Sequence, residues 1–219
     1  MVMPRRNVMR LDAPESYYHV YARGNSKHRI FIDEQDFITF LQILERYLSP
    51  EEAKNVNGMS YPNFYNKVDL IAYCLMPNHF HFLIGVTEKS TEKIKLGGIE
   101  IDRITDGFRK LLSEYAQEFN LKSHRSGSLF RQKTKGKLLH SDGDYAIICF
   151  HYIHQNPYRA KLVKKIEDWE FSSFRDYAQL RNGTLCKKDI TSLYFEISSS
   201  NFYEESYQVI PDSIVEKLF

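Results

Sequence analysis

The sequence predicts an α+β fold in which an antiparallel sheet carries helices on one face and a further helix follows towards the C-terminal end. Short β-rich runs alternate with longer stretches of helical period, and glycine, proline and asparagine separate them. Two of the β-rich runs are joined by a short turn. The 219 residues are 42% hydrophobic and 26% charged, which is typical of a globular domain and argues against a disordered or fibrous chain.

The first two expected elements are a strand and a helix. Residues 17–23 are rich in aromatic and β-branched residues and stop at the turn dipeptide Gly24-Asn25. Asp33 is a good N-cap, and apolar residues then recur at three- and four-residue spacing until Pro50, which predicts an amphipathic helix. Residues 49–67 contain prolines, asparagines and a glycine, so we expect an irregular loop.

A hairpin and a second helix come next. Residues 68–75 and 79–86 are β-rich runs on either side of Met76-Pro77-Asn78, a spacing typical of an antiparallel pair. Residues 88–98 are polar and contain glycine. From about residue 101 to 119 the apolar side chains keep helical period, which predicts an amphipathic helix packed on the sheet.

Residues 126–137 then predict a basic edge strand or hairpin. Asp142 or Asp144 can cap a third helix, and we expect Pro157 to end it. The order strand, helix, strand, strand, helix, strand is a ferredoxin-like β-α-β-β-α-β core with an extra C-terminal helix. We expect a single domain over residues 1–180 and an accessory tail over residues 181–219.

Charge is unevenly distributed along the chain. The 30 Lys and Arg against 28 Asp and Glu leave a net charge of +2. Residues 1–29 nevertheless hold six basic and two acidic residues (+4), and residues 103–140 hold nine and three (+6). From residue 187 onward, three basic residues face six acidic ones. Such runs are more often solvated faces than binding sites, but basic tracts also follow nucleic-acid backbones.

Three cysteines without a C-x-x-C pair indicate a reducing compartment rather than a disulfide framework. The first 14 residues carry arginines but no apolar segment typical of a signal peptide. No apolar run reaches the roughly 18 residues that a membrane span requires. We therefore expect a cytoplasmic protein.

The motif His79-Phe80-His81 lies in an expected strand. Strand alternation sends the two histidines to one face and Phe80 to the core on the other, so both imidazoles can ligate one divalent ion. A His-x-His pair alone is a weak signal, because hydrogen-bonded structural histidines are more common. A metal site needs a third ligand.

The third helix offers a candidate. Tyr152 and Asn156 are four residues apart and therefore share a helical face. Taken singly, Tyr152 would more often be a core aromatic and Asn156 a helix-terminal residue. Their combination with the histidine pair is more specific than either part.

Together these residues resemble the single-tyrosine HUH transposases, and among them the REP-associated tyrosine transposases, relatives of the IS200-like transposases. The resemblance runs in order from about residue 17 to residue 177. Its motifs are Tyr18-His19-Val20 leading to Arg23-Gly24-Asn25, Met76-Pro77-Asn78-His79-Phe80-His81, Phe130-Arg131-Gln132-Lys133, Tyr152-Ile153-His154-Gln155-Asn156-Pro157 and Ser172-Ser173-Phe174-Arg175-Asp176-Tyr177.

The resemblance implies that residues 1–180 form a catalytic domain with Tyr152 as the nucleophile and His79, His81 and Asn156 as metal ligands. In the insertion-sequence relatives a glutamine stands one turn after the tyrosine. Here Asn156 has that spacing and Gln155 does not, although Gln155 and His154 remain alternatives. We otherwise expect His151 and His154 on the helix surface or facing DNA. Mixed nitrogen and amide-oxygen ligation suits Mg²⁺ or Mn²⁺, with zinc as an alternative.

The implied reaction is metal-dependent cleavage and strand transfer of single-stranded DNA through a 5′-phosphotyrosine, the chemistry of DNA transposition and recombination. We expect the DNA, a hairpin or repeat, to contact six residues of the basic tracts. They are Arg23, Asn25, Lys27, Arg131, Lys133 and Lys135. Some of the 31 aromatic rings can stack on its bases. A monomer is favoured over a homodimer, and membrane partners are not expected.

Two other functions are alternatives to this one. The first is a non-catalytic DNA-binding protein derived from a transposase, which the intact set of His79, His81, Tyr152 and Asn156 disfavours. The second is a small-molecule metallohydrolase, for which the sequence offers no general base or pocket.

Overall fold

The computed structural model describes residues 9–54, 57–90, 92–131, 134–139, 144–195 and 201–219. Its centre is a four-stranded antiparallel sheet in the order β2-β3-β1-β6. The strands are β1 (Ser16–Arg23), β2 (Val68–Met76), β3 (His79–Val86) and β6 (Lys135–Leu139). With helices α1 (Glu34–Leu48) and α2 (Arg103–Lys122) between them, they make the expected ferredoxin-like core.

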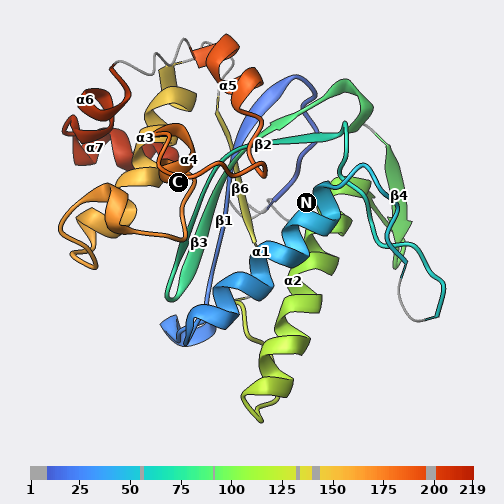
Figure 1. The fold of residues 1–219 in the computed structure, drawn as a ribbon. Coiled ribbons are helices and arrows are strands. Elements are labelled where there is room, and N and C mark those ends of the chain that lie inside the picture. Colours follow the sequence, from blue (N-terminus) through green and yellow to red (C-terminus); the bar gives the residue numbers. More distant parts are fainter. Residues whose placement is uncertain (1–8, 55–56, 91, 132–133, 140–143, 196–200) are drawn as a thin grey trace.

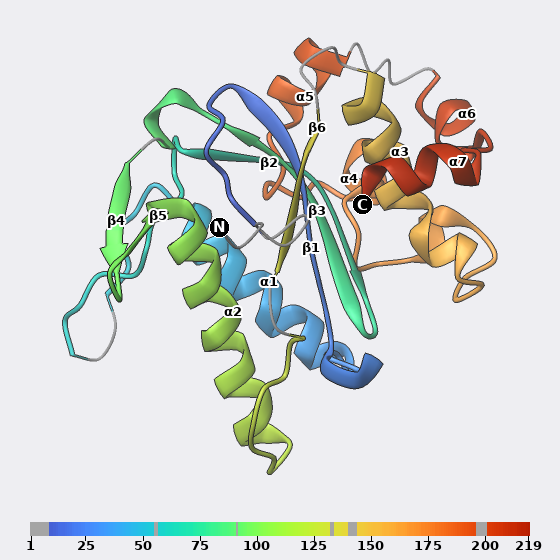
Figure 2. The same ribbon diagram turned by 180° about the vertical axis from the view of Figure 1, so that it is seen from behind.

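Helices cover both faces of this sheet. Figures 1 and 2 show α1 and α2 together on one face and α3 (Asp144–Arg159) on the other. Alternation along β3 explains the division, because Phe80, Phe82 and Ile84 belong to the apolar core under α1 and α2. Leu83, from the other side of the same strand, packs with residues of α3.

Ion pairs connect the start of α1 to the end of α2. Asp33 caps α1, and Asp36 completes a reciprocal capping box by accepting from the Asp33 main-chain nitrogen. Lys122, in the last turn of α2, donates to Asp33 at 2.6 Å and to Asp36 at 2.7 Å. The predicted cap is therefore confirmed, and it also joins the two helices.

Several boundaries differ from those expected. The polar stretch after β3 contains a small hairpin of β4 (Lys93–Leu96) and β5 (Ile99–Asp102). Asp144 is the first residue of α3 rather than its cap, and Asp142 lies outside the described residues. Pro157 lies inside α3, which continues to Arg159. The proline removes one donor, but the helix goes on because the Ala160 nitrogen still reaches the Asn156 carbonyl at 2.9 Å.

β6 begins nine residues later than the basic segment that was expected to form it. The intervening residues 129–131 still run beside the end of β1, where Arg131 donates from its main chain to the Arg23 carbonyl at 2.8 Å. Asn25 donates likewise to the Leu129 carbonyl at 2.9 Å. The basic segment is therefore held next to β1 although it is not a regular strand there.

The chain after α3 forms short helices, which are α4 (Phe174–Tyr177), α5 (Lys188–Phe195), α6 (Phe202–Tyr207) and α7 (Asp212–Val215). Of these, α6 packs on α3 and α5 contacts β2. Phe202 and Leu218 belong to the same buried cluster as Phe150 and Ile153 of α3. Figure 2 shows the C-terminal end of the chain beside α3 and the sheet. Across the described residues, no helix is long and apolar enough to cross a membrane.

We predict that the contact between α3 and α6 is weakened by acid through His151. Burial lowers the pKa of His151 to about 4, and its Nδ1 lies 3.1 Å from the Ser206 hydroxyl of α6. The unfolded chain binds this proton near pH 6.5 and the folded chain only near 4, so the stabilisation present at neutral pH is lost as the pH falls between those values.

Urea unfolding at pH 7 and pH 5 measures this contribution. Wild type should lose about 2 kcal/mol more stability between the two pH values than His151→Gln, in which nothing titrates at this position. The surface variant His124→Gln serves as the control and should behave like wild type. An equal loss in His151→Gln and wild type would contradict the prediction.

Candidate active site

The two histidines of the His-x-His motif stand side by side on the α3 face of the sheet. His79 and His81 are two residues apart on β3, with their ring centroids at 4.9 Å and their planes perpendicular. Phe80, between them, is fully buried on the opposite face. The alternation predicted from the sequence is confirmed.

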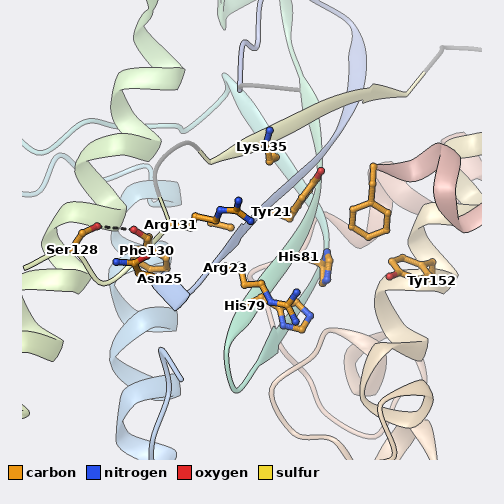
Figure 3. A pocket seen from close by; sticks show the side chains of 12 residues that line it. Tyr21, Arg23, Asn25, His79, His81, Ser128, Phe130, Arg131, Lys135 and Tyr152 are labelled. Carbon is orange, nitrogen blue, oxygen red and sulfur yellow. Dashed lines mark hydrogen bonds between the residues drawn. The ribbon is translucent and has the colours of Figure 1, made fainter. Parts of the chain in front are cut away.

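A tyrosine on α3 faces this pair. The Tyr152 ring centroid lies 6.0 Å from that of His81, and Figure 3 shows the hydroxyl directed toward the histidines. The helix holds the ring in place because Ile153 and Cys149 beside it are fully buried against the sheet. Phe219 packs edge-on against the same ring, with the centroids 5.7 Å apart.

A cavity of about 890 Å³ joins the histidines, the tyrosine and the basic segment. Its polar lining includes Arg23 and Asn25 from β1 and the turn after it, and Arg131 and Lys135 from the segment leading into β6 (Figure 3). Four of the six residues expected to contact DNA therefore line one cavity with the histidines and Tyr152. Lys27 does not line it, and Lys133 lies outside the described residues.

Asn156 lies one turn after Tyr152, as its spacing predicted. Its side chain is buried, and its Nδ2 donates to the Tyr152 main-chain carbonyl at 2.8 Å. It is not among the described residues that line the cavity. Its role as a third ligand stays a prediction.

The alternative ligands, His154 and Gln155, are hydrogen-bonded to groups outside the cavity. His154 is fully buried, and its Nε2 lies 2.8 Å from the Ser173 hydroxyl. Gln155 donates to the main-chain carbonyls of Ser206 and Gln208 at 3.0 and 2.8 Å. His151 and His154 were expected on the helix surface or facing DNA, and that expectation is wrong, because the tail covers this side of α3.

Burial shifts the pKa values of the two histidines and of the tyrosine. It lowers the pKa of His79 to about 4, helped by the charge of Arg23, and it holds the pKa of His81 well below its ordinary value. Both rings are therefore neutral at physiological pH, the form that ligates metals. Burial raises the pKa of Tyr152 to about 12, although the nearby charge of Arg159 opposes the shift. The Tyr152 hydroxyl is therefore protonated at neutral pH.

Two residues of the site, His19 and Asn78, belong to the motifs of the family resemblance, but no sequence pattern predicts a role for them. His19 of β1 is fully buried, and its Nε2 lies 2.8 Å from Nδ1 of His81. Asn78, in the turn before β3, places its Oδ1 2.6 Å from Nδ1 of His79. Strand alternation places His19 on the same face of β1 as Tyr17 and Tyr21. The register between β1 and β3, which pairs Tyr21 with His81, then brings His19 next to His81.

The donor set suits a divalent ion in part. His79 and His81 offer two adjacent neutral imidazoles. Among the described residues, no group of three or more His, Cys, Asp or Glu side chains could hold a metal. Within the described residues, the remaining ligands would come from an amide such as that of Asn156 or from water.

A ferredoxin-like sheet that presents a His-x-His pair to a helix-borne tyrosine is the arrangement that the resemblance to single-tyrosine HUH transposases implied. Comparison with known proteins confirms that resemblance and points within the class to the REP-associated tyrosine transposases. No protein-family model matches the chain.

The curated relative is a Haemophilus influenzae protein assigned to the REP-associated tyrosine transposases. It is 26% identical to this chain over 108 residues, which are 48% of this chain and 58% of the relative. The chain therefore matches little more than half of that protein's length.

One solved structure that this chain resembles is that of a REP-associated tyrosine transposase bound to a REP hairpin. It aligns with 82% of this chain and 86% of its own, with a TM-score of 0.51 and 15% identity. At this identity the match shows a common fold.

We predict that Gly24 is required for the turn that carries Asn25 into the cavity. A Cβ at Gly24 would lie 2.1 Å from the His28 carbonyl oxygen, which the turn folds back upon it. Gly24→Ala should therefore cost about 1–3 kcal/mol of unfolding free energy. Gly85→Ala in β3 is the matched control, because its Cβ would meet nothing closer than 3.6 Å. Urea unfolding of both variants tests the prediction, and equal stabilities would contradict it.

Proposed function

We propose that this protein cleaves and rejoins single-stranded DNA next to a hairpin, as a divalent-metal-dependent transposase or endonuclease that uses Tyr152 as its nucleophile. The observation that carries the proposal is the position of Tyr152, which faces His79 and His81 across a cavity that also holds Arg23, Arg131 and Lys135. The resemblance to REP-associated tyrosine transposases, one of which is solved with a REP hairpin, supports the choice of substrate.

The cavity combines what such a reaction requires. A phosphodiester is negatively charged, so a cavity lined by Arg23, Arg131 and Lys135 suits it. Phe130 adds an aromatic ring on which a base can stack. The cavity volume of about 890 Å³ leaves room for more than one nucleotide.

Tyr152 performs the covalent step. Its oxygen forms a bond to phosphorus while the bond from phosphorus to the 3′-oxygen breaks, which leaves a 5′-phosphotyrosine and a free 3′-hydroxyl. The phenol proton passes to water, and the leaving 3′-oxygen takes a proton from water. Attack by another 3′-hydroxyl reverses these changes and joins two strands without ATP, because the phosphotyrosine keeps the energy of the broken bond.

His79, His81 and Asn156 are the residues that would hold the metal, Mg²⁺ or Mn²⁺. A bound divalent ion would polarise a non-bridging phosphate oxygen and stabilise charge in the transition state. The cation addresses the difficulty that burial creates, since a phenol with a pKa of about 12 is almost wholly protonated at neutral pH.

We predict that Tyr152→Phe abolishes covalent attachment to DNA but leaves hairpin binding intact. The substitution removes only the attacking oxygen, and the ring contacts with His81 and Phe219 remain. The assay incubates protein, Mn²⁺ and a 5′-extended DNA hairpin and resolves the protein–DNA adduct on a denaturing gel.

Tyr17→Phe is the control. Tyr17 lies on the face of β1 that carries His19, and this variant should form the adduct like wild type. Undiminished adduct in Tyr152→Phe would overturn the assignment of the nucleophile. Hairpin binding without an adduct in any metal, even in wild type, would instead favour the non-catalytic DNA-binding protein.

We also predict that Arg159 assists the nucleophile through its charge. The guanidinium carbon lies 6.0 Å from the Tyr152 ring centroid, and its charge lowers a pKa that burial raises to about 12. In Arg159→Gln the phenolate fraction at any pH below 12 falls, so adduct formation should slow about three- to tenfold at pH 7.5 and recover as the pH is raised.

Arg159 also bonds Asp212 at 2.8 Å, so Asp212→Asn is the matched control. That variant loses the ion pair and keeps the charge beside Tyr152. Slowing of the same size in Asp212→Asn would show that the ion pair with the tail, rather than the charge on Tyr152, is responsible.

A further inference from the structure

Each of the two histidines of the candidate metal site is hydrogen-bonded through Nδ1 to a neighbouring side chain, and each neighbour is bonded in turn to a main-chain carbonyl. For His81 the neighbour is His19 and the carbonyl is that of Leu218. For His79 the neighbour is Asn78 and the carbonyl is that of Lys27. Each series of hydrogen bonds therefore ends at a main-chain carbonyl, which can only accept. The donor and the acceptor of every bond in the two hydrogen-bond chains follow from that.

The chain through His19 starts at the Leu218 carbonyl, 2.8 Å from Nδ1 of His19. That nitrogen must carry a hydrogen. His19 is fully buried, and among the described residues no carboxylate is hydrogen-bonded to it, so a charged imidazolium would be left uncompensated. The ring is therefore neutral and its Nε2 is an acceptor. At 2.8 Å from it, Nδ1 of His81 must be the donor, which leaves the lone pair of His81 on Nε2.

The chain through Asn78 gives the same result by a different route. The Lys27 carbonyl lies 3.4 Å from the Asn78 Nδ2, which identifies this atom as the amide nitrogen. Oδ1 then faces His79 and can only accept, so Nδ1 of His79 is the donor at 2.6 Å. The lone pair of His79 is likewise on Nε2.

We propose that His19 and Asn78 are positioning residues that hold His81 and His79 in the tautomer with hydrogen on Nδ1, so that both Nε2 lone pairs are available to one divalent cation. The inference rests on the proposed function, since it concerns the same metal site. Neither residue touches the reacting atoms. Each acts through the histidine next to it, by fixing the ring's orientation and its tautomer.

The proposal gives the tail a specific part in the site. Leu218 is fully buried, and it precedes Phe219, whose ring packs against His19 at 5.1 Å between centroids. The carbonyl that fixes the tautomer of His19 is thus held in place by packing from a segment nearly 200 positions away in the chain. The tail therefore contacts the sheet face of β1 and β3 through this hydrogen bond and through the ring of Phe219.

The two variants that separate positioning from packing at position 19 are His19→Gln and His19→Phe. Glutamine places an oxygen acceptor near the position of the lost Nε2, whereas phenylalanine keeps the ring and removes both nitrogens. Asn78→Asp and Asn78→Leu form the equivalent pair, because aspartate keeps the acceptor toward His79 and leucine does not.

Two measurements are made on each protein. The ¹⁵N chemical shifts of the histidine side chains, assigned by single substitutions in the metal-free protein, report which ring nitrogen carries hydrogen. Titration calorimetry with Mn²⁺ alone reports the metal affinity.

In wild type we expect both His79 and His81 with hydrogen on Nδ1. His19→Phe and Asn78→Leu should mix the tautomers of His81 and His79, respectively, and weaken Mn²⁺ binding about 10- to 100-fold. His19→Gln and Asn78→Asp should keep the tautomer and an affinity within about threefold of wild type.

Hydrogen on Nε2 of His81 or His79 in wild type would overturn the proposal, as would unchanged tautomers and unchanged Mn²⁺ affinity in His19→Phe and Asn78→Leu. A merely structural role predicts equal losses in both members of each pair and would also overturn it. Failure of the proposed function looks different. In that case the metal-free tautomers follow the expected pattern, but wild type binds no Mn²⁺ and forms no adduct.

Discussion

The pairing of β1 with β3 is the interaction on which the rest of the site depends. These two central strands alternate between an apolar face, which α1 and α2 cover, and a face that carries His19, His79 and His81. A slip of one residue in their register would turn the phenylalanines of β3 toward α3 and the histidines into the core. The aromatic core under α1 and α2 therefore keeps the histidines on the α3 face, because burying Phe80 and Phe82 is far more favourable than burying imidazoles in their place.

Covering both faces of the sheet also buries side chains of the site. α3 and the tail bury His81 almost completely and leave Tyr152 only 9% exposed. Burial has opposite consequences for the two kinds of group. It keeps the imidazoles neutral and able to bind a cation, but it also makes the phenol harder to ionise. In the proposed reaction, burial would leave His79 and His81 able to bind a cation, and Tyr152 would depend on that cation and on the charge of Arg159.

Local patterns predicted the elements that lie within one stretch of sequence. The N-cap at Asp33, the alternation of His79, Phe80 and His81, and the shared helical face of Tyr152 and Asn156 are all confirmed, since each depends on neighbours within four residues. The β4–β5 hairpin was missed because its strands are only four residues long. α3 runs past Pro157, and His154 is buried, because packing from the tail outweighs the local preference.

By itself, the sequence determined the fold class, the alternation of the histidine pair and the basic character of the segment around Arg131. These features follow from periodicity and residue type, which are properties of contiguous residues, whereas the association of Tyr152 with the histidines came from the resemblance to single-tyrosine transposases. Only the tertiary structure decided that His19 lies beside His81, that Leu218 returns to β1, and that the basic segment lies along the end of the same strand. Strand register and the return of a distant segment depend on the free energy of the whole core, which no short stretch of sequence contains.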